Sequence, residues 1–408
     1  MEDAGRAMAA ARPRVVAALA ARLRDLDMAE EAFAEACVAA IEAWRREPPR
    51  DPAAWLWRAA LHKAFDAKRR LAVRARAVHD ERPAAPTPED DLLAADEPIP
   101  DERLRLIFVC CHPAVGAEAR AALTLKVVCG LSTERLARAF LVAEPAMLQR
   151  ITRAKRKTRD AAVSFEVPAR ESWSERLEAV LATLEIAYAQ AYQDAALADD
   201  GALFALEVLR LSGVLAELMP REPEVLGLAA LVRFAEARRP ARLDADGAMI
   251  APSLQDDRLW RADLIAEGTH LLDSAASFGV LGPRQLIAAI HGAHLSRRET
   301  GMTPWADIVG LYDALMNFRP DPVTAVNRAV AVGEARGMSA GLAALQEIPG
   351  GGRLASWLPY QAARAGLCEG AGLLTDAASA YRAALALKPA PAERRYLEHR
   401  LAGLALAR

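Results

Sequence analysis

Residues 130–159, GLSTERLARAFLVAEPAMLQRITRAKRKTR, decide how this part of the chain folds and indicate what it binds. Ser132 is placed to cap the helix TERLARAF, because its hydroxyl can accept hydrogen bonds from the free amides of the first helical turn. After a four-residue turn, Pro145 suits the first turn of a second helix, where its missing amide costs nothing. Two helices joined by so short a turn are typical of a helix-turn-helix.

The second of these helices is predicted to have one buried and one exposed face. Met147, Ile151 and Ala154 recur at helical spacing and should face the core. The positions left outside by this register are Leu148, Gln149, Arg150, Thr152 and Arg153. Gln and Arg side chains can make paired hydrogen bonds to adenine and guanine edges in the major groove, so this face predicts the reading of duplex DNA.

The same region is strongly basic. Between residues 117 and 159, ten Lys and Arg residues stand against three acids, a net charge of +7. Cations concentrated at a helix end attract phosphate. The residues expected to do so are Arg135, Arg138, Lys155, Arg156 and Lys157. For the charge alone, a solvated basic helix end is the competing interpretation.

The segment before residue 80 predicts a bundle of at least three helices. Apolar residues recur at helical spacing from Pro13 onward, and the prolines of EPPRDP at 47–52 separate the last two helices. Trp55 and Trp57 precede a second basic cluster. Its members include Lys63, Lys68, Arg69 and Arg70. Cations interleaved with aromatic rings suit a single strand, whose bases can stack on the rings. A core role is the alternative for the tryptophans, and we favour it for Trp55.

Composition bounds the whole chain. Its 408 residues allow two or three compact units, and 53% hydrophobic against 5% aromatic residues, with abundant Ala and Leu, favours an all-α fold. The net charge of −2 divides into +4 up to residue 160 and −6 beyond it. No stretch has the length of apolar residues that a membrane helix or a signal peptide needs, and five cysteines without framework spacing are expected to be reduced. We therefore expect a cytoplasmic protein without membrane contact.

Four regions follow from these patterns. We expect a helical bundle at 10–79, an acidic Pro-rich linker at 80–102, the helix-turn-helix domain at 103–162, and a large α-helical, repeat-like extension at 169–408. One part of the extension fits a tetratricopeptide template. The matching residues are Ala365, Ala377, Tyr381, Ala384 and Pro389. An irregular helical domain is the alternative for this extension.

Together these segments resemble an extracytoplasmic-function (ECF) sigma factor of the sigma-70 family. The resemblance is carried by DMAEEAFAEACVAAIEAW at 27–44, WLWRAALHKAFDAKRR at 55–70 and the helix-turn-helix ending in RAKRK at 153–157. IFVCCHPAV at 107–115, LSTERLARAF and the helical half that follows resemble the subgroup with a long tetratricopeptide-like extension. Ala34, Leu61 and His62 depart from the residues common in the family.

The resemblance implies a partner for each surface. It implies that an acidic helix docks on the β′ clamp helices of core RNA polymerase. The acids concerned are Asp27, Glu30, Glu31 and Glu35. Residues 55–70 would hold the non-template strand of the −10 element, and Gln149, Arg150 and Arg153 would read the −35 element, with the β flap as a further polymerase contact. The extension would take a regulatory protein or a small ligand.

Two other classes of protein compete with this interpretation. A helix-turn-helix regulator would bind DNA without polymerase, and an enzyme would use a site in the C-terminal half. We expect no catalytic group, no cofactor and no metal. Cys110-Cys111-His112 lacks the ligand spacing of a zinc site, His291 and His294 lack a third ligand, and Asp244 to Gly247 is too short for a calcium loop.

Overall fold

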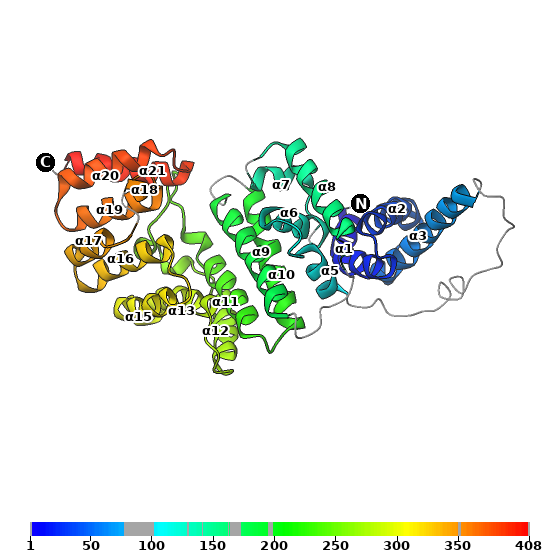
Figure 1. Ribbon diagram of the computed structural model, residues 1–408, viewed down its shortest axis with the longest axis horizontal. Coiled ribbons are helices and arrows are strands. Elements are labelled where there is room, and N and C mark those ends of the chain that lie inside the picture. Colours follow the sequence, from blue (N-terminus) through cyan, green and yellow to red (C-terminus); the bar gives the residue numbers. More distant parts are fainter. Residues whose placement is uncertain are drawn as a thin grey trace. The chain divides into compact units, whose positions relative to one another are not determined.

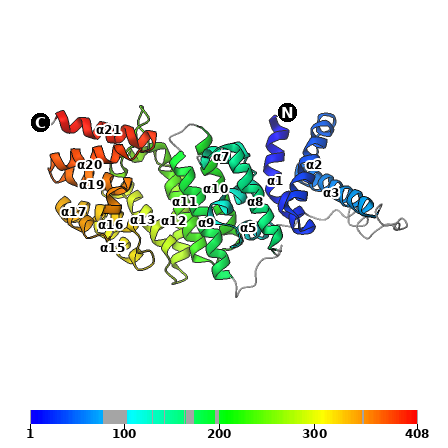
Figure 2. The same cartoon turned by 45° about the horizontal axis from the view of Figure 1, so that its top comes forward.

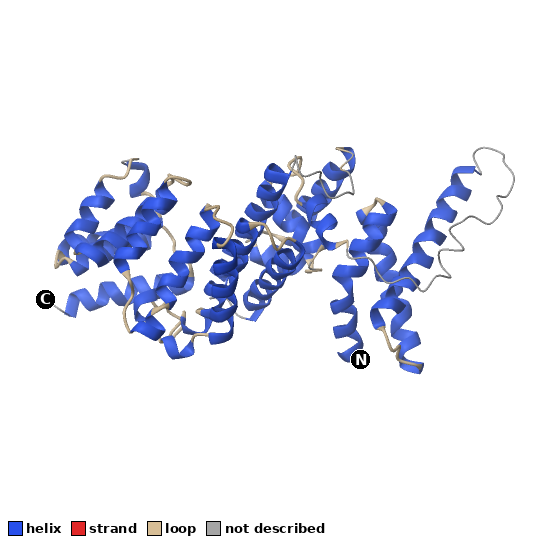
Figure 3. Ribbon diagram, turned by 90° about the horizontal axis from the view of Figure 1, so that it is seen from below, coloured by secondary structure: helices blue, strands red, loops and turns tan. Residues whose placement is uncertain are grey.

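Helices form every regular element in the described part of the chain (Figure 3). The computed structural model describes residues 2–76, 102–128, 130–140, 142–161, 163, 173–194, 199–349 and 352–406. The all-α prediction is therefore confirmed. The expected acidic linker at 80–102 lies outside the described residues except for Glu102. None of the described helices combines the length and apolar character that crossing a bilayer requires.

The chain divides into two compact units, residues 1–190 and 191–408 (Figure 1). The first unit contains a bundle of three long helices that pack on one another. Their bounds are α1 Glu2–Leu23, α2 Leu26–Arg46 and α3 Pro52–Arg76. Asp25 caps α2 by accepting hydrogen bonds from the amides of Asp27 and Met28 at 2.8 and 3.0 Å. The expected break at EPPRDP is present, and Asp51 caps α3 through Ala53 and Ala54.

Four shorter helices form a second bundle. Their bounds are α5 Arg103–Cys110, α6 Ala117–Val127, α7 Thr133–Ala139 and α8 Glu144–Asp160. The Ser132 hydroxyl accepts from the Arg135 amide at 3.2 Å, as the sequence predicts, and Pro145 lies in the first turn of α8. Met147 and Ile151 are buried and α8 packs on α6 and α7, so the expected inner face of this helix is confirmed.

The two bundles pack together. α1 contacts α5, and α8 lies beside α1 in Figures 1 and 2. A further helix, α9 (Trp173–Asp194), is bonded to the second bundle. Arg176 of α9 donates to the Phe108 carbonyl oxygen of α5 at 2.8 Å. The first unit therefore extends to residue 190, beyond the boundary at 169 that composition suggests.

The second unit consists of helices that pack in order along the chain. Its longer helices are α10 Asp199–Leu218, α11 Pro223–Ala237, α12 Ala262–Ala276, α13 Pro283–Leu295, α15 Trp305–Met316, α16 Pro322–Arg336, α17 Met338–Gln346, α19 Leu358–Gly370, α20 Leu374–Ala386 and α21 Pro391–Leu406. α11 packs against α10, α12 and α13, and its Glu224 carboxylate accepts from the Arg284 and Gln285 amides at the start of α13. The remaining elements are single turns, α14 Arg297–Thr300 and α18 Gly352–Ala355, and three short 3₁₀ segments.

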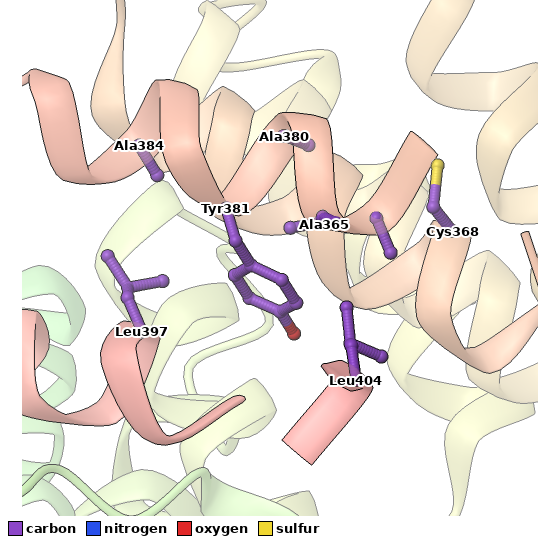
Figure 4. Packing of buried hydrophobic residues seen from close by; sticks show 9 residues of the cluster. Ala365, Cys368, Ala380, Tyr381, Ala384, Leu397 and Leu404 are labelled. Atoms are coloured by element: carbon purple, nitrogen blue, oxygen red, sulfur yellow. The ribbon is translucent and has the colours of Figure 1, made fainter. Parts of the chain in front are cut away.

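The residues that suggest a tetratricopeptide unit meet in one core. Ala365, Ala377, Tyr381 and Ala384 are at most 1% exposed and belong to a cluster formed by α19, α20 and α21 (Figure 4). The Tyr381 hydroxyl donates to Glu369 Oε2 at 2.6 Å, and Arg400 bonds the same carboxylate. Small residues therefore let α19 and α20 approach closely around one large aromatic ring.

Candidate nucleic-acid interface

The outer face of α8 presents side chains that can bind DNA. Gln149, Arg153, Arg156 and Lys157 are exposed, as is Arg135 on α7, whereas the Arg138 side chain lies outside the described part. Since Met147, Ile151 and Ala154 hold the opposite face in the core, α8 is a rigid support for these groups. Such an arrangement can present amide and guanidinium donors to a groove.

Arg150 differs from its exposed neighbours because two contacts within the protein hold its side chain. One guanidinium nitrogen lies 3.2 Å from Glu118 Oε2 on α6, and the guanidinium carbon lies 6.0 Å from the centre of the Phe140 ring. The side chain is 28% exposed, so it can still meet a ligand. These contacts limit its rotamers before any ligand arrives, which favours geometric selectivity over loose electrostatic attraction.

The second basic surface lies on α3. Lys68, Arg69 and Arg70 are exposed and Lys63 is half-buried. Trp57, expected to stack on bases, is only 7% exposed and lies in the bundle core. This corrects the sequence interpretation: Trp57 shares a helical face with Leu61 and Ala64, which are also buried, so the 3.6-residue period turns it inward.

Trp55, for which the sequence favoured a core role, is half-buried. Its ring meets the Trp44 ring edge-on at 5.7 Å between centroids. This pair joins α2 to α3 near the break between them. Neither Trp55 nor Trp57 is therefore fully exposed beside the described cations of α3.

The acids of α2 fall into two groups. Glu31 is exposed and Glu35 half-buried. Asp27 and Glu30 instead contact α8, because the Lys155 ammonium lies 2.7 Å from Asp27 Oδ1 and 2.6 Å from Glu30 Oε2. Arg159 adds a bond of 2.5 Å to Asp27. The structure thus brings together residues that the sequence assigned to two different partners.

Arg12, which sequence reasoning missed, joins this contact, and Lys126, counted there only among the basic residues, is affected by its charges. Arg12 of α1 bonds Glu30 Oε1 at 2.6 Å and lies over the Phe33 ring. Lys126 of α6 is half-buried, and its pKa is lowered by burial, with Glu30 opposing that effect and Arg12 and Lys155 adding to it. The available signal for Arg12 was a cation within the largely apolar stretch MAAARPRVVAALA, which also contains Arg14.

The minor sequence candidates are structural where described. Burial raises the pKa of the Cys111 thiol, which contacts Thr124 at 3.3 Å. The Asp244 carboxylate accepts from the amides of Asp246 and Ala248, which makes that segment a turn, as the sequence favoured. Over the described ranges, no group of three or more His, Cys, Asp or Glu residues is arranged to hold a metal ion.

Two protein families and one relative match the chain. Residues 8–74 match the family described as Sigma-70 region 2, and residues 176–276 match a Family of unknown function (DUF6596). The chain is 39% identical over 414 residues to an uncharacterized protein of Rhizobium meliloti (strain 1021), covering 98% of this chain and 95% of that protein. No solved structure matches significantly. The first match spans both the acids of α2 and the cations of α3.

Proposed function

Because the chain belongs to the family of this Rhizobium protein and its first bundle is a sigma-70 region 2 domain, we propose that it is an alternative sigma factor of the ECF type. Region 2 supports a role in RNA polymerase binding and promoter melting. In this proposal the chain binds core polymerase and directs it to a restricted set of promoters. No catalytic group or cofactor is needed, and the protein acts in the cytoplasm, where polymerase is.

The match of residues 8–74 to region 2 carries the proposal. Within that range, α2 presents Glu31 and Glu35 for the β′ clamp helices, and α3 presents Lys68, Arg69 and Arg70 for an unpaired strand. Acids and cations on separate helices of one bundle allow it to bind a basic protein surface and a polyanion together.

The second bundle is proposed to act as region 4. The packed α7 and α8, with the short turn between them, support a helix-turn-helix that reads the −35 element. Arg150 is the braced reader, Gln149 and Arg153 are its exposed neighbours, and Arg156 and Lys157 contact phosphates. The β flap is the expected polymerase contact of this bundle.

The helical remainder is proposed to regulate the sigma factor. Residues 161–408 carry a net charge of −6, and the packed α19–α20 pair supports a tetratricopeptide-like surface for a regulatory protein or a small ligand. Covalent attachment would let it take the place of a separate anti-sigma protein.

One observation favours a second function, a helix-turn-helix regulator that binds operators without polymerase. Asp27 and Glu30, two of the four acids assigned to the polymerase, are bonded within the chain to Lys155. If these bonds persist in the working protein, the acidic helix is structural. Retention of duplex binding with no capture of core polymerase would establish this alternative.

Run-off transcription with purified core polymerase on genomic fragments tests the proposal. We expect transcripts that depend on the added chain, and their loss with Glu35→Lys, which reverses a charge on the docking face. Glu47→Lys makes the same change at the exposed residue that follows α2, away from that face, and should retain activity. Absence of any chain-dependent transcript, together with failure to retain core polymerase in a pull-down, would refute a sigma factor.

A further inference from the structure

Five charged residues form a connected cluster between the two bundles. The α2–α8 ion cluster consists of Arg12, Asp27, Glu30, Lys155 and Arg159. Both carboxylate oxygens of Asp27 are occupied, one by Lys155 and one by Arg159. Both oxygens of Glu30 are occupied as well, one by Arg12 and one by Lys155. In this state each carboxylate oxygen of these two acids already accepts a bond from a cation of the chain, which leaves less negative charge for a basic partner surface.

The centre of the cluster is shielded from water. Lys155 and Glu30 are each only 16% exposed, and Arg12 is 18% exposed. Burial opposes the charge of Lys155, but Glu30 and Asp27 outweigh it and raise the pKa of this lysine. Attraction between half-buried charges is screened less by salt than attraction across an exposed surface. Salt should therefore weaken this contact less than it weakens an ion pair on an exposed surface.

Apolar packing supports the same arrangement. α1 packs on α5, and Val15, Val16 and Leu19, which follow Arg12 on α1 by three to seven residues, are buried. Arg12 also donates to the Val127 carbonyl at 3.5 Å, where a cation suits the C-terminal end of α6. A Cβ on Gly130 would come within 2.7 Å of the Arg12 side chain, so the Arg12 side chain fills the junction between the bundles.

We propose that the α2–α8 ion cluster is an autoinhibitory contact, in which the chain covers part of its polymerase-docking acids with part of its DNA-gripping cations. This inference rests on the proposed function. Asp27 and Glu30 use two of the three N–H groups of Lys155, and their two negative charges repel a DNA phosphate, so partners compete with the contact. Polymerase that takes Asp27 and Glu30 releases Lys155 and Arg159, and DNA that takes those cations releases the acids. By reciprocity, each partner then favours binding of the other.

The cover is partial, which gives partners a place to begin. Glu31 on α2 and Gln149, Arg153, Arg156 and Lys157 on α8 remain exposed. A weak encounter at these residues can precede opening of the cluster. The free chain would then bind either partner weakly, whereas the assembled complex would hold both.

A zero-length cross-linker tests the contact in the full chain. A carbodiimide joins a carboxylate to an amine only where they touch, and mass spectrometry of the peptides identifies the pair. We expect Lys155 to be joined to Asp27 or Glu30 in the free chain, and exposed Lys157, the control on the same helix, not to be. Saturating core polymerase or duplex DNA should lower the yield about fivefold or more.

An unchanged yield in the presence of bound polymerase and bound DNA would overturn the inference, as would the absence of this cross-link in the free chain. If the yield falls with DNA while polymerase never binds, the covering of the cations is supported and the sigma-factor proposal fails. The two failures are therefore distinguishable.

Arg12→Met removes the bonds from α1 to Glu30 and to the Val127 carbonyl oxygen, which loosens the junction that holds α8 beside α2, without altering a residue assigned to either partner. The methionine keeps an apolar stem against Phe33 and removes the positive charge that Glu30 contacts. Duplex binding by the free chain should rise about threefold or more, and the cross-link yield should fall. Arg22→Met, an exposed position of α1, is the matched control. Glu30→Gln, an isosteric change, should lower the yield of the Lys155 cross-link to Asp27 as well. Unaltered yields in both folded variants would contradict the inference.

Discussion

Loss of the Arg150 side chain should affect DNA binding differently from loss of the nearby Arg156 side chain. Arg150 is held by Glu118 at 3.2 Å and by the Phe140 ring, so its guanidinium is oriented before DNA arrives. Arg156 is 70% exposed, and its guanidinium lies 4.0 Å from the carboxylate of Asp160, a loose contact at the surface. We expect Arg150 to read a base edge and Arg156 to contact a phosphate.

The size of the two effects follows from these roles. A good paired contact between arginine and guanine discriminates by about 1–3 kcal/mol, so Arg150→Ala should weaken binding about 5- to 150-fold at the preferred base pair. The loss should shrink when that base pair is replaced, because the contact is then already absent. Arg156→Ala should weaken binding by one and the same factor on every duplex. It should also reduce the slope of log K against log salt concentration by about 0.9.

Fluorescence anisotropy titrations can measure both effects. The wild type and the two variants are titrated with a labelled promoter duplex, with duplexes changed one base pair at a time, and at several salt concentrations. Arg150→Ala should relax the preference at one position and leave the salt slope nearly unchanged. If both variants lost the same factor on all duplexes with equal changes in slope, the assignment of the reading face of α8 would be wrong.

Three further predictions concern stability. Glu30→Gln leaves Arg12, Lys126 and Lys155 sharing fewer acids and should lower the free energy of unfolding by about 2 kcal/mol, whereas exposed Glu31→Gln should change it by less than about 0.5 kcal/mol, as measured by urea denaturation. Burial, with Arg238 adding to it, lowers the pKa of His291 to about 3 and of His294 to about 4 from the ordinary 6.5. Their contribution to the free energy of unfolding is therefore complete above pH 6.5 and is lost below it, because the unfolded chain then takes up protons. The loss is about 2 kcal/mol for each histidine between pH 7 and pH 5. The double variant His291→Leu, His294→Leu should therefore flatten the pH dependence of denaturation. Tyr381→Ala should lower the free energy of unfolding by about 3–5 kcal/mol and Tyr381→Phe by about 1–2 kcal/mol, because the phenylalanine keeps the ring and loses only the bond to Glu369. Equal losses of stability in thermal denaturation of the two variants would contradict this.

Local patterns predicted the parts of the candidate site that depend on a few consecutive residues. The cap at Ser132, the start of α8 near Pro145 and the burial of Met147 and Ile151 all follow from hydrogen bonds within one turn or from helical periodicity. The inference about Trp57 failed because it relied on the mixture of aromatic and basic residues instead of the register that places Trp57 with Leu61. Had periodicity been applied there, the burial would have been predicted.

The amino-acid sequence by itself determined the helices, the inner face of each amphipathic one and the family of the first bundle, because apolar spacing and caps act over a turn or two. Only the tertiary structure decided which charges meet. Lys155 bonds Asp27 and Glu30 across 128 and 125 residues, and that contact exists because α1 packs on α5. No local pattern encodes the docking of one bundle on another, since it depends on the summed shape and apolar surface of both.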